Sequence, residues 1–451
     1  MRFIRKLFSF LLCAALLLSL PAAAFADSSP APFELTVLVD GSDDTTVRAY
    51  AESYAGNLYL SLLDLSLALQ GTDRQFRLEY SYSNDNGEAF TVRFGQTAAD
   101  SGVTRLVTEA PAVRHLNLTR NRFYVEDSER KYYTYRSTDR DLYMSLTDVQ
   151  LMLDMTAELV SDTCVKLYPG RAFVPDLTRL AGEGYFDMFN SILLADADTG
   201  KALYSCAPNR VVPIASLSKL MGYLLLAEAM DEGRLHPDDI VTISKDAARL
   251  SLSADGIIFL SPGAEIPVSE LLEGMLLASS NECALALAEH TAGSESAFVE
   301  QMNDKAAQLG LHSAVFYTPH GLPAYTHDSV SAKLQNRMSA QDLFRLIRTL
   351  LAEHPEITQI TSQKYGEMEK LDYTTANSNP LVFNLEGTTG LKTGSTNKAG
   401  YCLAASLPVT SGEETHTIIL LLLGAETADV RGQAAEILLR YARSYYAENG
   451  F

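Results

Sequence analysis

Three short polar strings stand in a fixed order in the second half of this chain of 451 residues. They are Ser216-Leu217-Ser218-Lys219, Ser279-Ser280-Asn281 and Lys392-Thr393-Gly394. Together they supply a hydroxyl nucleophile, an amine beside it, a second hydroxyl and a further ammonium, which is the equipment of acyl transfer through a serine ester. A fold that uses all three must bring a helix start, a loop between helices and an edge strand to one cleft.

The first string lies where an apolar helix pattern begins. Ser216 follows Pro213-Ile214-Ala215 and opens the pattern, with Lys219 three residues further on. The two side chains are therefore expected on one helix face about one turn apart. A serine at a helix N-terminus also feels the positive end of the helix dipole. A simple N-cap role for Ser216 is the structural alternative, and Ser128–Lys131 and Ser395–Lys398 match the same spacing.

The other two strings have equally specific surroundings. Ser279-Ser280-Asn281 interrupts a helical pattern, which indicates either a simple turn between helices or a cleft wall that presents the Ser279 hydroxyl and the Asn281 amide. Gly390-Leu391-Lys392-Thr393-Gly394 precedes an apolar hairpin, which favours an edge strand that an extended peptide can join. Gly394 would let a ligand approach the backbone closely, whereas a surface strand with an exposed lysine is the alternative.

The pattern of the first half of the chain predicts a separate β-rich module, residues 27–172, with an internal repeat. Residues 58–65 (LYLSLLDL) recur as residues 142–149 (LYMSLTDV), 84 positions later. Each copy predicts a short strand, a short helix and then an alternating strand, the second of which is Cys164–Tyr168. Residues 173–184 are expected to be a linker.

Residues 185–451 carry mixed helix and strand patterns, which predict an α+β fold. A β-hairpin is expected around Asp198-Thr199-Gly200. The other expected elements are helices near 269–278, 282–291, 295–309 and 339–352, strands over 401–407 and 416–423, and a final amphipathic helix over 430–446.

The first 26 residues have the pattern of an export signal. Arg2, Arg5 and Lys6 precede an apolar run from residue 7 to residue 20, and Ala24-Phe25-Ala26 forms a small-x-small cleavage site. We expect cleavage after Ala26 and an extracytoplasmic protein, either secreted or associated with the cell wall. The alternative is an uncleaved anchor, although the run is short for spanning a bilayer.

Charge and cysteine content narrow the classes of partner. Lysine plus arginine is 36 and aspartate plus glutamate is 56, a net charge of −20, which disfavours nucleic acid and anionic lipid. The cysteines beyond the leader lie far apart without a C-x-x-C pair, so neither a metal site nor a cofactor is expected. They are Cys164, Cys206, Cys283 and Cys402. Buried free thiols are favoured, and disulfide pairing stays open.

Residues 185–451 resemble the catalytic domain of low-molecular-mass penicillin-binding proteins, the serine-type D-Ala-D-Ala carboxypeptidases. The similar stretches are residues 196–201, 213–221, 278–284, 318–322, 390–396 and 399–402. The resemblance implies a β-lactamase/transpeptidase-like domain, in which an antiparallel sheet carries a helical subdomain. It also implies peptidoglycan stem peptides ending in D-Ala-D-Ala as substrate and β-lactams as covalent inhibitors.

The same resemblance implies a role for each site residue. Ser216 attacks the D-Ala-D-Ala peptide bond, Lys219 takes its proton, and Ser279 passes a proton to the leaving D-alanine. Asn281 holds Lys219 or the substrate amide, and backbone N–H groups of Ser216 and Ser395 form an oxyanion hole. The substrate-binding residues are then Asn281, Lys392, Thr393, Gly394, Ser395 and Arg431, with Thr393 and Arg431 on the terminal carboxylate.

Two functions are alternatives to a carboxypeptidase. A β-lactamase on the same scaffold needs a dedicated deacylating carboxylate, and no Glu-x-x-x-Asn lies between the second and third strings. An inactive wall-binding protein is the third possibility. Many relatives have a C-terminal β domain and a membrane helix, and none is expected after Phe451. His320 and His327 are expected to pack or to face solvent.

The repeat in the first half also has a resemblance. Its Tyr-x-Ser-Leu-x-Asp signature, at Tyr59 and again at Tyr143, is loosely similar to the stalk-type domain at the N-terminus of copper amine oxidases. No metal ligands accompany it, so it implies a structural or wall-facing accessory module without chemistry of its own.

Overall fold

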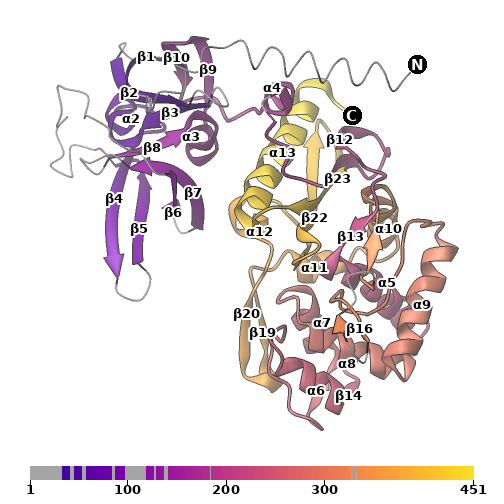
Figure 1. Cartoon of the computed structure of the whole chain (residues 1–451). Helices are drawn as coiled ribbons and strands as arrows, with labels where there is room; N and C mark the ends of the chain where they lie inside the picture. The colour runs from indigo at the N-terminus through magenta and orange to yellow at the C-terminus, as the bar shows by residue number, and fades with distance from the viewer. Residues whose placement is uncertain are drawn as a thin grey trace, which may run out of the picture. The chain divides into compact units, whose positions relative to one another are not determined.

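The computed structural model describes residues 33–40, 45–52, 57–83, 87–96, 118–125, 128–136, 141–182, 184–326, 329–330 and 334–451. The chain forms two compact units, Met1–Phe173 and Val174–Phe451, each built around its own large sheet (Figure 1). The expected leader, residues 1–26, lies outside the described residues.

The first unit is a ten-stranded sheet with two short helices, and its strand order is β4-β5-β6-β7-β8-β3-β2-β1-β10-β9. Its elements are β1 (Phe33–Val39), β2 (Thr45–Glu52), β3 (Asn57–Ser61), α2 (Leu62–Ala68), β4 (Phe76–Ser83), β5 (Gly87–Phe94), β6 (Leu118–Val125), β7 (Ser128–Arg136), β8 (Leu142–Ser145), α3 (Leu146–Leu153), β9 (Thr156–Ser161) and β10 (Cys164–Tyr168).

The sequence repeat is a structural repeat at the centre of this sheet. Strands β3 and β8 pair antiparallel, and each runs directly into a helix. Ser61 caps α2 and Ser145 caps α3, because each hydroxyl accepts the backbone N–H three residues further on. The strand that follows α3 is β9, so the expectation that Cys164–Tyr168 comes next was wrong by one strand.

The second unit has a five-stranded antiparallel sheet in the order β12-β11-β23-β22-β21. Its elements are α4 (Leu177–Gly182), β11 (Ser191–Asp196), β12 (Ala202–Cys206), β13 (Val212–Pro213), the 3₁₀ turn η2 (Ala215–Ser218), α5 (Lys219–Asp231), β14 (Ile240–Thr242), α6 (Lys245–Ser251), β15 (Glu265–Pro267), α7 (Val268–Leu276), α8 (Asn281–Ala292), α9 (Glu295–Gln308), β16 (Tyr325–Thr326), β17 (Ser329–Val330), β18 (Arg337–Met338), α10 (Ala340–Glu353), α11 (Ile357–Thr361), β19 (Tyr365–Met368), η3 (Glu369–Leu371), β20 (Tyr373–Ala376), α12 (Leu381–Asn384), β21 (Gly390–Thr396), β22 (Gly400–Ser411), β23 (Glu414–Ala425) and α13 (Ala428–Asn449).

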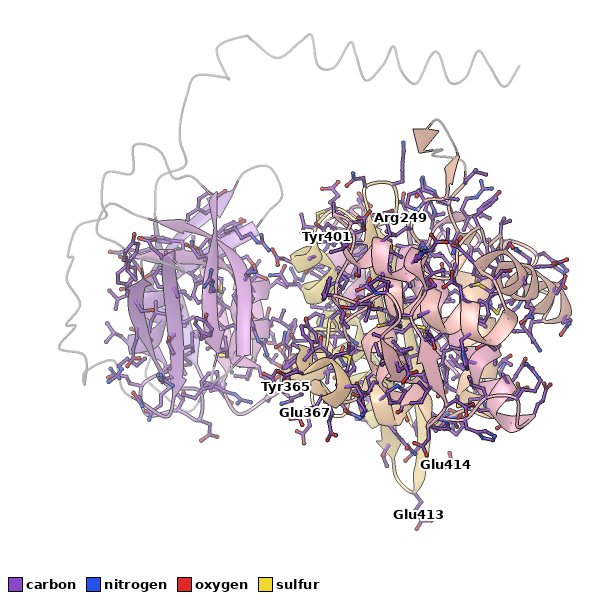
Figure 2. The ribbon with its side chains drawn as sticks, turned by 90° about the horizontal axis from the view of Figure 1, so that it is seen from below. Arg249, Tyr365, Glu367, Tyr401, Glu413 and Glu414 are labelled. Atoms are coloured by element: carbon purple, nitrogen blue, oxygen red, sulfur yellow. The ribbon has the colours of Figure 1, made fainter. Side chains whose placement is uncertain are left out.

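The middle of this sheet is covered on both faces. Every residue from Ile418 to Leu423 in β23 is buried, which requires packing on both sides because side chains alternate along a strand. One set of β23 residues joins the core formed with the helical part. The long helix α13 packs along β22 and β23 (Figure 1). The tip of the β22–β23 hairpin, with Glu413 and Glu414, projects from the unit (Figure 2).

The helical part surrounds α5, which is buried on almost every side. A helix that is apolar all round must lie inside the domain, and α5 contacts α8, α9 and α10. Its first residue, Lys219, thus begins in the interior. The sheet and helices confirm the expected α+β class, and the helices and strands of this half lie close to their predicted ranges.

All four described cysteines are free thiols. Cys283 and Cys402 are buried as expected, whereas Cys164 is half-buried and Cys206 is exposed. The expectation of a buried thiol was wrong for Cys206 because β12 is an edge strand with exposed residues. In the part of the chain that the structure describes, no helix is both long and apolar enough to cross a bilayer.

Candidate active site

Ser216 lies in the tight turn that leads into α5. The turn η2 is a 3₁₀ segment, and α5 begins only at Lys219, with Ser218 at its N-cap position. Ser216 is therefore not a helix cap, and it does not open the α-helix itself. The preceding residue, Ala215, has a positive φ of 48°, a strained conformation of the kind that persists where surrounding structure enforces it. Ser216 remains half-buried and reachable.

Lys219 makes three hydrogen bonds at the centre of the site. Its Nζ atom lies 2.9 Å from Ser216 Oγ, 2.8 Å from Asn281 Oδ1 and 2.9 Å from the backbone oxygen of His320. A neutral amine has two N–H donors and one lone pair, so it can satisfy Asn281 and His320 and accept the Ser216 proton. The arrangement thus fits a serine nucleophile beside an amine base.

Burial tunes this amine for proton transfer. Complete burial lowers the pKa of Lys219 to about 7, although the nearby charges of Glu282 and Cys283 oppose the shift. Desolvation disfavours the charged ammonium, which is why the direction is downward. A base with a pKa near neutrality accepts a proton efficiently at neutral pH.

Asn281 is held rigidly by the start of α8 and by a neighbouring loop. Its Nδ2 donates to the backbone oxygen of Asp255 at 2.8 Å, so both ends of the amide are used. The buried Glu282 carboxylate accepts the backbone N–H groups of Ile257 and Ile258 in the same loop. Among the described residues, no carboxylate hydrogen-bonds to Ser216 or Lys219.

Ser279 lies in the short segment between α7 and α8. Ser280 caps that helix by accepting Cys283 N at 3.0 Å, which leaves Ser279 outside the helix. Ser279 is half-buried and has a positive φ of 65°. Within the described residues it makes no hydrogen bond to Ser216 or Lys219, so no direct bond joins it to the nucleophile pair.

The third string forms the edge strand β21, as the pattern predicted. A Cβ atom added at Gly394 would lie 2.8 Å from Ser216 N, so only glycine allows β21 this close to the Ser216 turn. Lys392 is buried and donates to the backbone oxygen of Thr393 at 3.0 Å. Ser395 is exposed at the mouth of the site.

Arg431 reaches the sheet beneath this strand from the first turns of α13. Its Nη1 donates to the Cys402 backbone oxygen at 3.3 Å, and Cys402 pairs with Gly394. Its guanidinium also lies 6.0 Å from the ring of Tyr401, a surface residue in Figure 2. Burial, then the charges of Lys219 and Arg431, hold the pKa of Lys392 well below its usual range.

Two contributors lie in the loop at residues 318–322, for which the sequence predicted no chemical role. The backbone oxygen of His320, rather than its ring, accepts a hydrogen bond from Lys219 Nζ. A Cβ at Gly321 would lie 2.1 Å from Ala215 O, so this glycine permits the loop to pack against the nucleophile turn. The packing role expected for the His320 ring fits its burial, and His327 lies outside the described residues. The sequence signal that could have pointed to this loop is the similarity of residues 318–322 to penicillin-binding proteins.

A concavity of about 720 Å³ opens beside Ser395 and is lined by both charged and polar groups. It includes Asp255, Gln335, Ser395, Lys398, Tyr401 and Glu426. Because Ser395 follows Thr393 and Gly394 along β21, this space lies at the end of the strand opposite to Lys392.

One trio of potential metal ligands lies elsewhere, at Asp196, Asp198 and His416. One Asp196 oxygen already hydrogen-bonds to His416 Nδ1 at 2.7 Å and accepts a hydrogen bond from the Tyr446 hydroxyl at 2.9 Å. Its other oxygen accepts the backbone N–H groups of residues 198 and 199. These contacts use the lone pairs that an ion needs, and they tie β11, β23 and α13 together.

Comparison with known proteins is consistent with this geometry. The sequence profile of peptidase family S11, described as D-alanyl-D-alanine carboxypeptidase, matches residues 188–427. D-alanyl-D-alanine carboxypeptidase DacF of Bacillus subtilis is 36% identical over 259 residues, which cover 57% of this chain and 62% of that protein. The chain therefore spans about three fifths of the length of the curated relatives it matches.

Two solved structures are similar in fold. The peptidoglycan synthesis regulatory factor PBP3 of Streptococcus pneumoniae superposes with a TM-score of 0.52 at 29% identity, covering 58% of this chain and 72% of that one. Penicillin-binding protein 5 of Haemophilus influenzae superposes with a TM-score of 0.50 at 29% identity, covering 56% and 70%. They confirm the expected transpeptidase-like fold of the second unit.

Proposed function

The chain belongs to the D-alanyl-D-alanine carboxypeptidase family of peptidases, and from this premise we propose that it removes the terminal D-alanine from peptidoglycan stem peptides through an acyl-enzyme on Ser216. The observation that carries the proposal is the contact of Ser216 Oγ with the buried amine of Lys219, at 2.9 Å. The same acyl-enzyme chemistry makes β-lactams covalent inhibitors.

Acylation begins with proton transfer inside that contact. Neutral Lys219 takes the Ser216 proton while Oγ forms a bond to the carbonyl carbon of the scissile peptide. The carbonyl oxygen becomes negative and accepts the N–H groups of Ser216 and Ser395. One such donor is worth about 3–4 kcal/mol. The approach of Gly394 to Ser216 N supports this assignment, because it sets β21 directly against the Ser216 turn.

Collapse of this intermediate breaks the C–N bond and leaves an ester on Ser216. The leaving amine takes a proton that comes from the Lys219 ammonium through the Ser279 hydroxyl, which restores neutral Lys219. Water then attacks the ester with Lys219 as base, and the Ser216 hydroxyl is regenerated. Asn281 holds Lys219 in place throughout, because its own amide is fixed by Asp255.

Two buried basic side chains select the substrate carboxylate in a chain of net charge −20. Lys392 and Arg431 are both buried beside the strand that carries Thr393. In this low-dielectric setting the Arg431 guanidinium gives a local positive potential despite the acidic surface. Burial lowers the pKa of Lys392, and an incoming carboxylate favours its protonated form. Thr393 receives the terminal carboxylate, and the peptide before the scissile bond runs past Ser395 into the adjacent concavity.

The deciding experiment incubates the full chain with an acetylated peptide that ends in D-Ala-D-Ala and measures released D-alanine. Release that disappears in Ser216→Ala supports the proposal. Rapid, steady hydrolysis of penicillin without D-alanine release would assign a β-lactamase instead, although no carboxylate among the described residues contacts the nucleophile pair. Failure of both reactions would leave an inactive wall-binding protein.

We also propose that residues 1–26 direct export and are removed, so that the protein acts outside the cytoplasm, and that residues 27–172 are an accessory module joined by 173–184. The basic start, the apolar run and Ala24-Phe25-Ala26 support the first proposal. Mass spectrometry of the protein from culture should find an N-terminus at Asp27. An intact N-terminus at Met1 would contradict cleavage.

A further inference from the structure

We infer that Ser378 is a positioning residue for the C-terminal carboxylate of the substrate, acting through the hydroxyl of Thr393. The inference rests on the proposed function and extends the site to a segment outside the three strings. Thr393 Oγ1 donates to Ser378 Oγ at 2.8 Å, which links a side chain of strand β21 to a side chain of the turn before α12.

The turn that carries Ser378 is built to hold one conformation. Asn377 donates through Nδ2 to the backbone oxygens of Thr361 and Gln363, at 2.9 and 2.8 Å. Asn379 donates through Nδ2 to the backbone oxygen of Gly390, the first residue of β21. The two asparagines are also joined, because Asn377 Oδ1 accepts Asn379 N at 2.9 Å. Fixed neighbours on both sides leave the Ser378 hydroxyl little freedom.

Ser378 also connects two of the strings that the sequence singled out. Its backbone N–H donates to Leu277 O at 2.9 Å, and Leu277 stands two residues before Ser279. Its side chain accepts the hydrogen bond from Thr393. The turn at residues 377–379 therefore connects the loop before α8 to the edge strand β21.

Proton counting explains why a second hydroxyl is useful there. Each hydroxyl has one proton and two lone pairs. Without substrate, the Thr393 hydroxyl donates its proton to Ser378 Oγ. When a carboxylate arrives, Thr393 must donate to it, and the pair reverses so that Ser378 donates to Thr393 Oγ1. Without Ser378, the nearly buried Thr393 oxygen would lose its partner and its rotamer would be less restricted.

The position also identifies which part of the substrate is affected. Lys392 precedes Thr393 in β21, and Arg431 donates to Cys402 in the neighbouring strand β22. Basic groups therefore lie near Thr393, and a negative group is favoured there. Ser378 therefore acts on the carboxylate of the departing D-alanine rather than on the acyl portion, and its loss should weaken recognition without removing the nucleophile or the base.

The test compares two substrates in wild type and Ser378→Ala. One is an acetylated peptide ending in D-Ala-D-Ala, and the other is its C-terminal amide, which lacks the carboxylate. We expect Ser378→Ala to raise KM for the acid about five- to tenfold, with kcat within twofold and the amide unaffected. Ser378→Thr, which keeps the hydroxyl, should restore KM. Acylation by benzylpenicillin, which bears a carboxylate on its leaving-group side, should slow by the same factor.

Ser406→Ala is the matched control, because Ser406 Oγ makes a similar hydroxyl contact of 2.7 Å with Thr389 in the same sheet. It should leave the acid-over-amide preference unchanged. Equal losses for acid and amide in Ser378→Ala, or wild-type KM for both, would overturn the inference. A wild-type chain that neither releases D-alanine nor reacts with penicillin would instead reject the proposed function on which it rests.

Discussion

The Nζ atom of Lys219 lies 2.9 Å from the Oγ atom of Ser216, and Lys219 is fully buried while Ser216 remains reachable from solvent. The contact joins a residue of a 3₁₀ turn to the first residue of the α-helix that follows. As a consequence, the base that activates the Ser216 nucleophile is shielded from water.

Ser216→Ala should abolish covalent labelling by a fluorescent penicillin and reduce D-alanine release by about 10⁶-fold, because it removes the hydroxyl that contacts Lys219 Nζ. Gel fluorescence and a D-alanine assay measure the two effects. Ser128→Ala is an informative control, since Ser128–Lys131 has the same spacing but lies in strand β7 of the other unit. Full labelling of the Ser216 variant would refute the assigned nucleophile.

The acylation rate should rise with pH through a midpoint near 7. Burial lowers the pKa of Lys219 to about 7, so the amine is protonated and inactive as a base below that pH and neutral above it. The measurement is the second-order rate of penicillin acylation from pH 5 to 9, with circular dichroism to check that the chain stays folded. A flat profile, or a midpoint near 10, would contradict a depressed lysine.

Asn281→Asp should move that midpoint to higher pH and slow acylation at pH 7 by at least about tenfold. The new carboxylate would stand where Asn281 Oδ1 now lies, 2.8 Å from Lys219 Nζ, and would stabilise the ammonium. Asn303→Asp is the control, because the Asn303 amide also bridges two backbone oxygens, those of Val299 and Phe316, but does not contact Lys219. If both variants leave the midpoint in place, Asn281 does not control the base.

Gly394→Ala should lower the acylation rate by about 10²-fold or more, because its Cβ would lie 2.8 Å from Ser216 N and displace a proposed oxyanion donor. Gly432→Ala in α13 is the comparison, since the nearest atom there is 3.9 Å away and φ is not positive. It should keep full activity and stabilise the helix by roughly 1 kcal/mol. Normal acylation in Gly394→Ala would argue against a tight β21 contact.

Thiol titration should separate the cysteines by burial. The exposed Cys206 is expected to react with an aromatic disulfide reagent in the folded protein, and Cys206→Ser should remove that fast reaction. Burial raises the pKa of Cys283 to about 12 and that of Cys402 to about 11, so both should react only after unfolding. Rapid reaction of every thiol in the native state would show that the core is open.

The sequence predicted much of the second unit because its elements have strong local signals. The strands β22 and β23 and the helix α13 begin and end within four residues of their predicted ranges. The repeat in the first unit was also visible, because two copies of one pattern carry the same serine cap. The division of the chain at residues 26, 172 and 184 stays a prediction.

Errors arose where neighbours in space decide the outcome. The exposure of Cys206 depends on β12 being the last strand of its sheet, which an apolar pattern does not reveal. The contribution of His320 came from its backbone oxygen, whereas sequence reasoning considered only the imidazole. Ser378 had no recognisable signal, because its role depends on a contact with a strand 15 residues away.

By itself, the sequence determined which chemical groups are available and which local structures carry them: a serine and a lysine at a helix start, small polar residues before another helix, and a glycine-bounded strand. These follow from short-range patterns and from a resemblance to a known family. Only the tertiary structure decided that Ser216, Lys219 and Asn281 share one hydrogen-bonded cluster, and that Lys219 is buried deeply enough to lose its proton near neutral pH. The reason is that desolvation and hydrogen-bond geometry arise from atoms far apart along the chain, which only packing brings within 3 Å of Lys219 Nζ.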